Sequence, residues 1–383
     1  MSRRRWILGS TLGLAAILAL ASVTADDLLG DRKIAAAQDE FALLQALRRG
    51  ALEEYFSTVR AEIKFWSLNE EVRRGLADLE AGWKKLGNDA GSGLRALYIT
   101  DNPYPLGWRR QLERALDDSD YSKAHAELHD TARRLVGERG YYDFFLIDPQ
   151  GNVIYTVEKE ADYATNLNSG AFRETGLAEA YRRAVDASVR GSVVLTDMER
   201  YAPSADAPAM FAAVAILSRR SEVLGVLAMQ VPIDPIRDIM QFTGGMGRTG
   251  ETYLVGEDLL MRSDSRFSHE STILRVQVDT DTAVQALKGE QGVKFTDDYR
   301  GIEVLSAYGP MELDGFRWAV MAEIDRAEVV ESHIGLRGQI GWASLFAFLL
   351  GLWSLWYLRP GTGSGESAFD LIDPGTAVVD TSF

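Results

Sequence analysis

The stretch that decides the fold is GYYDFFLIDPQGNVIYTVEKEADYATNL, residues 140–167. Two apolar runs, 141–148 and 153–160, flank the four residues PQGN, which are typical of a turn. The runs are rich in aromatic and β-branched residues, which strands favour. We therefore predict a β-hairpin at this point of the chain.

Three more strand-like segments follow the hairpin, at 191–198, 209–218 and 223–233. A helical stretch, 176–187, separates them from it, and another predicted helix, 121–136, precedes it. The order of two strands, a helix and three antiparallel strands predicts one sheet with helices on one side, an α+β module.

The pattern recurs on a smaller scale further along the chain. GETYLVGEDLLMRSD, residues 250–264, predicts a second hairpin, 280–289 a short helix, and VKFTDDY, IEVLSAYGP and FRWAVMAEI three more strands. A predicted helix at 234–242 precedes this second module, and residues 327–335 are expected to join it to the membrane. We therefore expect two antiparallel-sheet modules in tandem.

A long helical region precedes both modules. Over 28–66 the apolar residues recur every three or four positions, and a second helix follows, until Gly91-Ser92-Gly93 is expected to end the helical region. Residues 98–108 read as extended and rich in turns. The apolar stripe of the long helix is expected to form a dimer seam or to pack on its own domain, and both remain open.

Two uncharged runs lie near the ends of the chain, 20 residues at 6–25 and 21 residues at 338–358. Each would span about 30 Å as a helix, roughly the hydrocarbon thickness of a bilayer. Arginines at 3–5 and Arg359 lie beside the runs, which predicts cytoplasmic ends and an outside domain, 26–337. The first run also fits a cleaved secretory signal, and that alternative stays open.

The composition excludes several classes of function. Lys and Arg number 41 against 56 Asp and Glu, for a net charge of −15, so a nucleic-acid-binding face is not expected. The chain has no cysteine, which excludes disulfides and thiolate chemistry. Because the charge belongs to the outside domain, that domain should stand away from anionic lipid.

Four phrases, at 140–167, 195–213, 223–234 and 247–267, carry a resemblance to a known family. In this order they resemble the double Cache extracytoplasmic sensor domain of bacterial chemoreceptors, sensor kinases and transmembrane adenylate and guanylate cyclases. The resemblance covers about 28–333. It implies a long N-terminal helix, a ligand-binding membrane-distal PAS-like module, a membrane-proximal module that often binds nothing, and a homodimer.

Two departures from the family qualify this resemblance. The amino-acid-binding version has an Arg-x-Trp-aromatic element followed by a Tyr and an Asp, whereas here Trp108-Arg109-Arg110 is inverted and precedes the sheet, which speaks against an amino-acid ligand. Relatives usually continue into an output domain. Only the tail 359–383 follows the second run here, so a separate or missing output domain is expected.

These readings combine into one expected organisation in a bacterial inner membrane, with the sensor domain in the periplasm or outside the cell. The expected parts are a cytoplasmic N-terminus (1–5), a first transmembrane helix or signal (6–25), the outside domain (26–337), a second transmembrane helix (338–358) and a disordered cytoplasmic tail (359–383). Within the outside domain we expect a helical stalk (28–90), a distal module (91–241) and a proximal module (242–333).

Two motifs resemble metal-binding or cofactor-binding patterns but fit a structural role better. His125 and His129 share a helical face without a third ligand, so packing or surface histidines are expected, and a metallohydrolase remains only a weak alternative. Gly245-x-Gly247-x-x-Gly250 follows a predicted helix and opens a strand, the reverse of a dinucleotide-binding turn. We therefore expect no enzyme, no cofactor and no metal site.

The best candidate for a ligand site is where polar groups interrupt strand ends and loops of the distal module. Carboxylates there would bind an ammonium, aromatic rings would form a wall, and amides would add donors. The candidate residues are Tyr155, Asp162, Tyr163, Asn166, Phe172, Arg173, Asp197 and Tyr201.

The sequence thus predicts a membrane-anchored sensor. It would bind a small polar ligand, form a homodimer, contact membrane lipid and act on a cytoplasmic or membrane signalling partner, as in signal transduction or chemotaxis. The alternative is a tethered solute-binding protein that delivers its ligand to a transporter.

Overall fold

The computed structural model describes residues 2–186 and 191–331 together with Phe346 and Leu349. Residues 33–331 form one compact unit, and Met1–Arg32 with Ser332–Phe383 are assigned to another. Within the described part of the chain, no helix meets the length and hydropathy expected of a membrane span. Of the predicted spans, 6–25 has only its backbone described, and 338–358 lies outside the described residues apart from Phe346 and Leu349.

The N-terminal helices agree with the periodicity of the sequence, with one exception. They are α1 (Ser2–Leu68), α2 (Glu70–Leu86), α3 (Ala90–Arg95) and α4 (Asp120–Arg139), with short helical turns at Gly87–Asp89, Ala96–Thr100 and Arg109–Gln111. The side chain of Asn69 caps α2 by accepting from the N–H groups of Glu71 and Val72. The prediction that Gly91-Ser92-Gly93 ends the helical region is wrong. A Cβ on Gly91 would lie 2.9 Å from the Ala164 carbonyl oxygen, so this glycine permits close packing.

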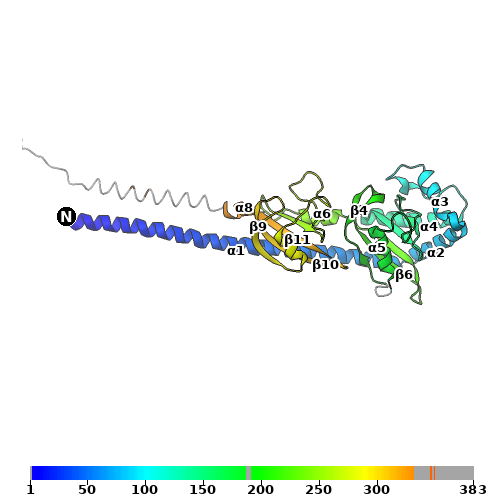
Figure 1. Ribbon diagram of the computed structural model, residues 1–383, viewed down its shortest axis with the longest axis horizontal. Coiled ribbons are helices and arrows are strands. Elements are labelled where there is room, and N and C mark those ends of the chain that lie inside the picture. The colour runs from blue at the N-terminus through cyan, green and yellow to red at the C-terminus, as the bar shows by residue number, and fades with distance from the viewer. Residues whose placement is uncertain (1, 187–190, 332–345, 347–348, 350–383) are drawn as a thin grey trace, which may run out of the picture. The chain divides into compact units, whose positions relative to one another are not determined.

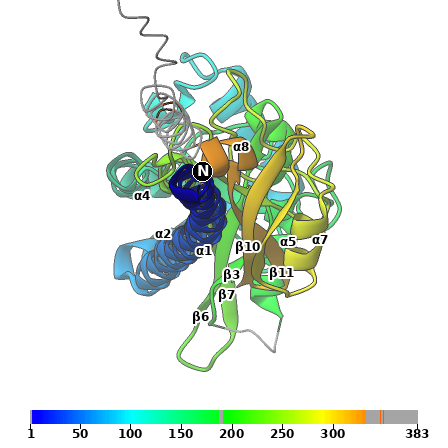
Figure 2. The same cartoon turned by 90° about the vertical axis from the view of Figure 1, so that its left-hand side faces the viewer.

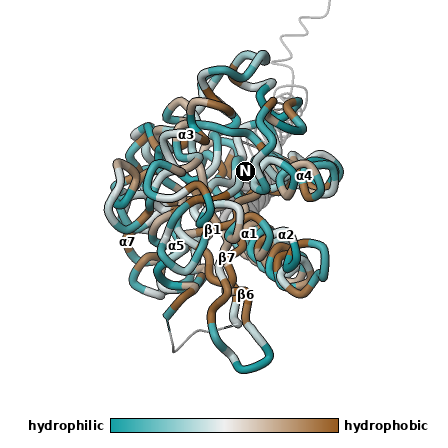
Figure 3. Tube along the Cα trace, turned by 90° about the vertical axis from the view of Figure 1, so that its right-hand side faces the viewer, coloured by the Kyte–Doolittle hydropathy of each residue, from teal (hydrophilic) through white to brown (hydrophobic). Residues whose placement is uncertain are grey.

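The distal module contains the predicted five-stranded antiparallel sheet, in the order β2-β1-β7-β6-β3. Its strands are β1 (Asp143–Ile147), β2 (Val153–Thr156), β3 (Val194–Leu195), β6 (Phe211–Leu217) and β7 (Val223–Gln230). A separate two-stranded ribbon, β4 (Glu199–Tyr201) with β5 (Ala207–Ala209), comes between β3 and β6 in the chain and was not predicted. Figure 3 shows hydrophobic residues along β1, β6 and β7.

Helices cover both faces of this sheet, so the expectation of helices on one side is wrong. Phe144 and Leu146 pack with residues of α1, α2 and α4, whereas Phe145 and Ile147 pack with α5 (Gly176–Val185). Figure 2 shows α5 and α7 on the side of the sheets away from α1. The physical reason is the continuous apolar run DFFLI, because every residue of such a strand is buried and both faces need cover.

The proximal module has a four-stranded antiparallel sheet in the order β8-β11-β10-β9. Its elements are α6 (Asp234–Gln241), β8 (Glu251–Val255), α7 (Asp281–Leu287), β9 (Gly292–Asp297), β10 (Glu303–Leu313), β11 (Phe316–Asp325) and α8 (Arg326–Glu331). The predicted hairpin at 250–264 is reduced to β8 with an isolated bridge from Val255 to Met261. Gly245 and Gly247 have positive φ between α6 and β8, as expected for a turn into this module.

The part of α1 from residue 33 onward packs on both modules (Figure 1). Phe41 and Leu44 pack against β10 and β11, and the Gln45 amide donates to the Val320 carbonyl at 3.4 Å. Further along the helix, Phe56 meets Trp318 with ring centroids 5.8 Å apart, and Ile63 packs in the core of the distal module. The apolar stripe of the long helix therefore packs on its own domain, one of the two roles expected of it.

Candidate functional site

A pocket of about 430 Å³ opens at one end of the distal sheet. Tyr142 before β1, Glu158 after β2 and Gln230 at the end of β7 contribute polar groups to its wall. Pro208 from the β4–β5 ribbon and Pro232 supply apolar surface. The volume lies in the range of small-molecule sites, which are mostly apolar with a few placed polar groups.

Three buried oxygens at this sheet end have no hydrogen-bond partner within the described part of the chain. They are Oδ2 of Asp143, Oδ1 of Asp162 and Oε1 of Gln230. Asp143 and Gln230 pair across β1 and β7, and alternation along both strands places their side chains on the sheet face that α5 covers. Unpaired buried acceptors are costly, so such a concentration at one place points to a bound donor.

Hydrogen bonds fix the two carboxylates from one side only. The N–H groups of Phe144, Val157 and Glu158 all donate to Oδ1 of Asp143, at 2.7, 2.8 and 3.1 Å. The hydroxyl of Tyr201 donates to Oδ2 of Asp162 at 2.6 Å. Each carboxylate therefore keeps its other oxygen for a further donor.

Burial and mutual repulsion govern the charge of these carboxylates. Burial raises the pKa of Asp143 well above its usual range, and the charge of Asp162 raises it further. Burial raises the pKa of Asp162 to about 7, although the hydrogen bond from Tyr201 acts in the opposite direction. Two such groups favour a proton or a cation between them.

Basic side chains near the site already have partners. Arg110 lies 3.2 Å from Glu158, and Nη1 of Arg109 donates to the Lys159 carbonyl at 3.2 Å. The Lys159 amine is fully buried, donates to the Val157 carbonyl at 3.2 Å and has its pKa lowered to about 7 by burial, against the charges of Asp143 and Glu158. Asp143, Lys159 and Gln230 were not selected from the sequence as candidate ligand-binding residues. Each lies within a predicted strand whose other residues are mostly apolar or charged.

The two predicted tyrosines Tyr155 and Tyr163 lie in an aromatic cluster. The Tyr155 hydroxyl lies 2.7 Å from Nδ1 of His129, and His129 stacks on His125 with ring centroids 4.7 Å apart. The Tyr163 hydroxyl lies 2.7 Å from that of Tyr121. All five side chains are buried, so the two histidines pack inside the module rather than on its surface.

Tyr155 and Val153 pack on opposite faces of the sheet, although residues two apart on a regular strand share a face. Val153 packs toward α5, whereas Tyr155 packs on the α4 side beside Ile154. The pairing of β1 with β2 shifts register between Leu146 and Ile147, and this irregularity breaks the alternation.

Asn166, Phe172 and Arg173 make contacts with other parts of the distal module. Asn166 orders the neighbouring loop by donating to the carbonyl of Gln150 and the side chain of Asn152, at 3.0 and 2.9 Å. Phe172 packs partly buried beside the α5 core, and Arg173 is exposed and pairs with Glu174 at 3.3 Å. Of the eight candidates, the structure brings Asp162 and Tyr201 into direct contact at the sheet end.

Asp197 joins the two modules. Its carboxylate accepts two hydrogen bonds from the Arg262 guanidinium, at 3.0 and 2.7 Å, and a third from the Trp318 indole at 2.7 Å. Nearby, the Asp314 side chain at the turn between β10 and β11 accepts from Arg60 and from the backbone N–H of Leu195, at 3.1 and 3.0 Å. We call the contacts of Asp197 with Arg262 and Trp318 the module joint.

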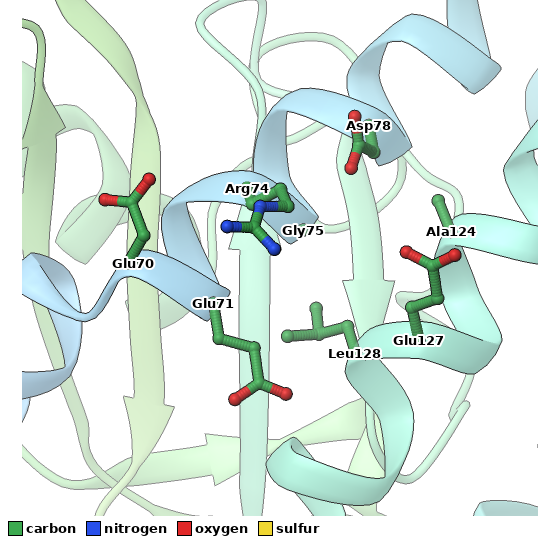
Figure 4. A pocket seen from close by; sticks show the side chains of 8 residues that line it. All are labelled: Glu70, Glu71, Arg74, Gly75, Asp78, Ala124, Glu127 and Leu128. Carbon is green, nitrogen blue, oxygen red and sulfur yellow. The ribbon is translucent and has the colours of Figure 1, made fainter.

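A second pocket, of about 380 Å³, lies between α2 and α4 (Figure 4). Glu70, Glu71 and Asp78 from α2 and Glu127 from α4 surround it, with Arg74 among them. Its side chains include no buried polar atom without a partner, so it lacks the feature that marks the sheet-end pocket.

Comparison with known proteins places the fold in a family. A model of the Cache domain matches residues 52–332, which is more than half of the chain. The chain belongs to the Cache domain family. Cache domains are ligand-sensing domains of signal-transduction proteins.

Similar solved structures include ligand-binding domains of two bacterial chemoreceptors. One is that of Campylobacter jejuni Tlp3 in complex with 4-methylisoleucine, with 11% identity, a TM-score of 0.45 and coverage of 79% of this chain and 94% of that one. The other is that of Pseudomonas fluorescens CtaA in complex with L-leucine, with 15% identity, a TM-score of 0.35 and coverage of 71% and 99%. A comparison with curated proteins found no significant match.

The proximal Cache module also contains buried carboxylates, Glu251 and Glu323, which pair across β8 and β11. Here every carboxylate oxygen has a donor. The hydroxyls of Ser265 and Tyr299 donate to Glu251, at 2.8 and 2.9 Å. Those of Ser306 and Tyr253 donate to Glu323, at 2.7 and 2.8 Å. This network is complete without a ligand.

Proposed function

We propose that the chain is a membrane-anchored extracytoplasmic sensor that binds a small polar ligand in the distal Cache module. The observation that carries the proposal is the set of three unpaired buried oxygens beside a pocket of about 430 Å³. The role of the site in this proposal is binding. Hydroxyls alone do not complete the site, whereas they complete its counterpart in the proximal module.

The module joint supports transmission from the distal to the proximal module. Tyr201, which contacts Asp162, follows Asp197 by four residues on the chain that includes β4. Asp197 in turn holds Trp318 of β11, and β11 leads directly to α8 and the predicted span 338–358. We propose that ligand binding changes the packing at the joint and that the span passes this change to a cytoplasmic or membrane signalling partner.

The proposed assembly is a homodimer in the bacterial inner membrane, with the sensor domain outside the cytoplasm. From residue 30 onward, where its side chains are described, the long helix α1 exposes four large apolar side chains in addition to its buried stripe. They are Leu43, Leu47, Phe65 and Leu68. Such an exposed row fits a contact with a second copy, while the runs 6–25 and 338–358 contact lipid in this proposal.

The test is a thermal-stability screen of the full-length chain against a mixture of small polar metabolites. A ligand present at 100 times its dissociation constant adds about 2.7 kcal/mol to the stability of the folded state. We expect Tyr142→Ala and Gln230→Leu to abolish the gain, because both residues line the sheet-end pocket. The matched control is Glu127→Ala in the pocket between α2 and α4, which should keep it. A gain lost only in the control would contradict the proposal.

A further inference from the structure

Glu251 belongs to a ring of three hydrogen-bonded side chains in the proximal module. Its two carboxyl oxygens lie 2.8 Å from the Ser265 hydroxyl and 2.9 Å from the Tyr299 hydroxyl, and these two hydroxyl oxygens lie 2.7 Å from each other. All three separations are those of O–H···O hydrogen bonds, and each such bond needs its own proton. The two hydroxyls carry two protons, so the ring closes only when Glu251 carries the third.

An ionised Glu251 does not fit this ring. Both hydroxyls would then donate to the carboxylate, and their oxygens would face each other at 2.7 Å with no proton between them. The backbone holds Ser265 in place, because its oxygen accepts from the N–H of Phe267 at 3.2 Å and its own N–H donates to Thr272 at 2.9 Å. Glu251 and Ser265 are both buried, so they depend on the ring for their hydrogen bonds.

The nearest charges also favour the protonated form of Glu251. Burial raises the pKa of Glu251 and the charge of Asp298 raises it further, whereas the two hydroxyls and Arg300 act in the opposite direction. Arg300 is bound to two other carboxylates, those of Asp298 at 2.6 Å and Asp325 at 3.2 Å. The guanidinium that could neutralise Glu251 is therefore already shared.

Glu323 and Tyr253 face the ring from the neighbouring strands. Glu323 is buried and pairs with Glu251 across β8 and β11. Its oxygens accept from the hydroxyls of Ser306 and Tyr253, at 2.7 and 2.8 Å, so this carboxyl group has a separate donor for each oxygen. Burial raises the pKa of Glu323 to about 7, and the charges of Asp298 and Glu251 act in the same direction. The two glutamates thus oppose each other's ionisation.

The other charged groups on the packed elements have partners of their own. In the loop after β8, Asp264 accepts from a backbone N–H of the same loop at 2.8 Å, and Arg266 donates to the Gly250 carbonyl at 2.5 Å. On α7, Asp281 is exposed and pairs with Lys294 of β9. The protonation of Glu251 is therefore governed by the ring and by the neighbours described above.

The ring is connected to the helix that leaves the module. Tyr299 directly precedes Arg300, and the Arg300 guanidinium binds Asp325, the last residue of β11. The backbone N–H of Asp325 donates to the Thr249 hydroxyl at 3.2 Å, two residues before Glu251. Helix α8 begins directly after Asp325. A displacement of Tyr299 therefore reaches the start of α8 through one ion pair.

We propose that the proximal module senses pH: Glu251 holds a proton that closes the ring with Ser265 and Tyr299, and loss of this proton moves the Tyr299 turn and the start of α8. The step is an ionisation, in which the carboxyl group of Glu251 releases one proton to the solvent and becomes a carboxylate. The ring is closed at low pH and opens as pH rises through the raised pKa of Glu251. This input is separate from the proposed ligand site in the distal module.

A single fluorophore on α8 tests the proposal. The chain has no cysteine, so one engineered cysteine takes one environment-sensitive label. Val330→Cys places the label on α8 and Leu224→Cys places it on β7, where the original side chains are 39% and 38% exposed. When the purified full-length chain is titrated upward from about pH 4, emission at position 330 should change in one transition centred above about 4.3, the usual pKa of glutamate. No transition at position 330, or the same transition at position 224, would overturn the proposal.

Amide variants assign the transition to the ring. Glu251→Gln keeps the ring closed at every pH, because an amide both donates and accepts, as a protonated carboxyl group does. The label at position 330 should then show its low-pH emission throughout. Glu323→Gln changes a buried carboxyl group outside the ring and should keep the transition. Loss of the transition in Glu323→Gln alone, or in both variants, would overturn the proposal.

Tyr299→Phe tests the transmission independently of Glu251→Gln. It removes the ring hydroxyl that lies next to Arg300 but keeps the aromatic ring, so emission at position 330 should no longer follow pH. Thermal unfolding of each variant checks that it is folded. A full transition in folded Tyr299→Phe would overturn the proposal. Its failure leaves the proposed ligand site untouched, because Glu251, Ser265 and Tyr299 do not line the sheet-end pocket.

Discussion

The two Cache modules share a plan but differ in how they treat buried carboxylates. In the proximal module, Glu251 and Glu323 face each other across neighbouring strands, and four hydroxyls satisfy their oxygens. In the distal module, Asp143 and Asp162 each keep one unpaired oxygen beside an open pocket. The same sheet can therefore hold a closed polar network or a site that needs a further donor. The number of satisfied oxygens distinguishes the two better than the presence of acidic residues does.

The largest loss of stability is expected from a variant that breaks the connection between the modules. Asp197→Ala should destabilise the chain by about 3 kcal/mol, because it leaves the Arg262 guanidinium, whose side chain is only 3% exposed, without its bidentate partner. Chemical denaturation of the full-length chain measures this change.

Asp258→Ala is the matched control for the joint. Asp258 also pairs with Arg262, at 2.9 Å, but its side chain is about half exposed, so its removal should cost less than about 1 kcal/mol. Similar losses in the two variants would show that the buried pairing with Asp197 has no special role.

A smaller effect sharpens the comparison itself. Glu323→Gln should destabilise the chain by about 1–2 kcal/mol. The amide has one acceptor oxygen, whereas the carboxylate has two, so one of the two hydroxyls that donate to Glu323 would lose its acceptor. Asp162→Asn should cost less or even stabilise, because the residue already has an unpaired oxygen and a neighbouring like charge. A larger loss of stability for Asp162→Asn than for Glu323→Gln would contradict the view that the proximal network is complete and the distal site is not.

The pH dependence of stability tests the same pair of variants. Burial raises the pKa of both Asp162 and Glu323 to about 7, above the value of about 4 in an unfolded chain. The folded state therefore binds extra protons between pH 4 and 7, and stability should fall as pH rises through that window. Each variant should flatten part of this fall in denaturation curves at several pH values. An unchanged slope in both would contradict the burial of ionisable carboxyls.

Much of the fold followed from local patterns in the sequence. The five strands of the distal module, the repeat of the plan and the turn at Gly245 and Gly247 come from alternation, composition and glycine placement, which act over a few residues. The second covered face of the sheet was missed, although the unbroken run DFFLI signals it. Gly91 was misread because a close approach to Ala164 depends on tertiary contact.

The site was less predictable than the fold. Asp162 and Tyr201 were expected at the sheet end, and their contact of 2.6 Å joins residues 39 positions apart. Asp143 was overlooked because the strand around it is otherwise apolar, and Gln230 because nothing local separates an unpaired amide oxygen from a paired one. Asp197 was assigned to a ligand on the basis of its strand end, whereas its partners Arg262 and Trp318 lie 65 and 121 residues away.

Hydrogen exchange of the full-length chain, with and without a saturating amount of the metabolite that stabilises it most in the thermal screen, tests the central contrast between the modules most directly. The account predicts slower exchange in 142–160 and 226–234, which contain the strand ends around the pocket, and no comparable slowing around Glu251 and Glu323. Slower exchange confined to the strands of the proximal module, or none in either module, would contradict it.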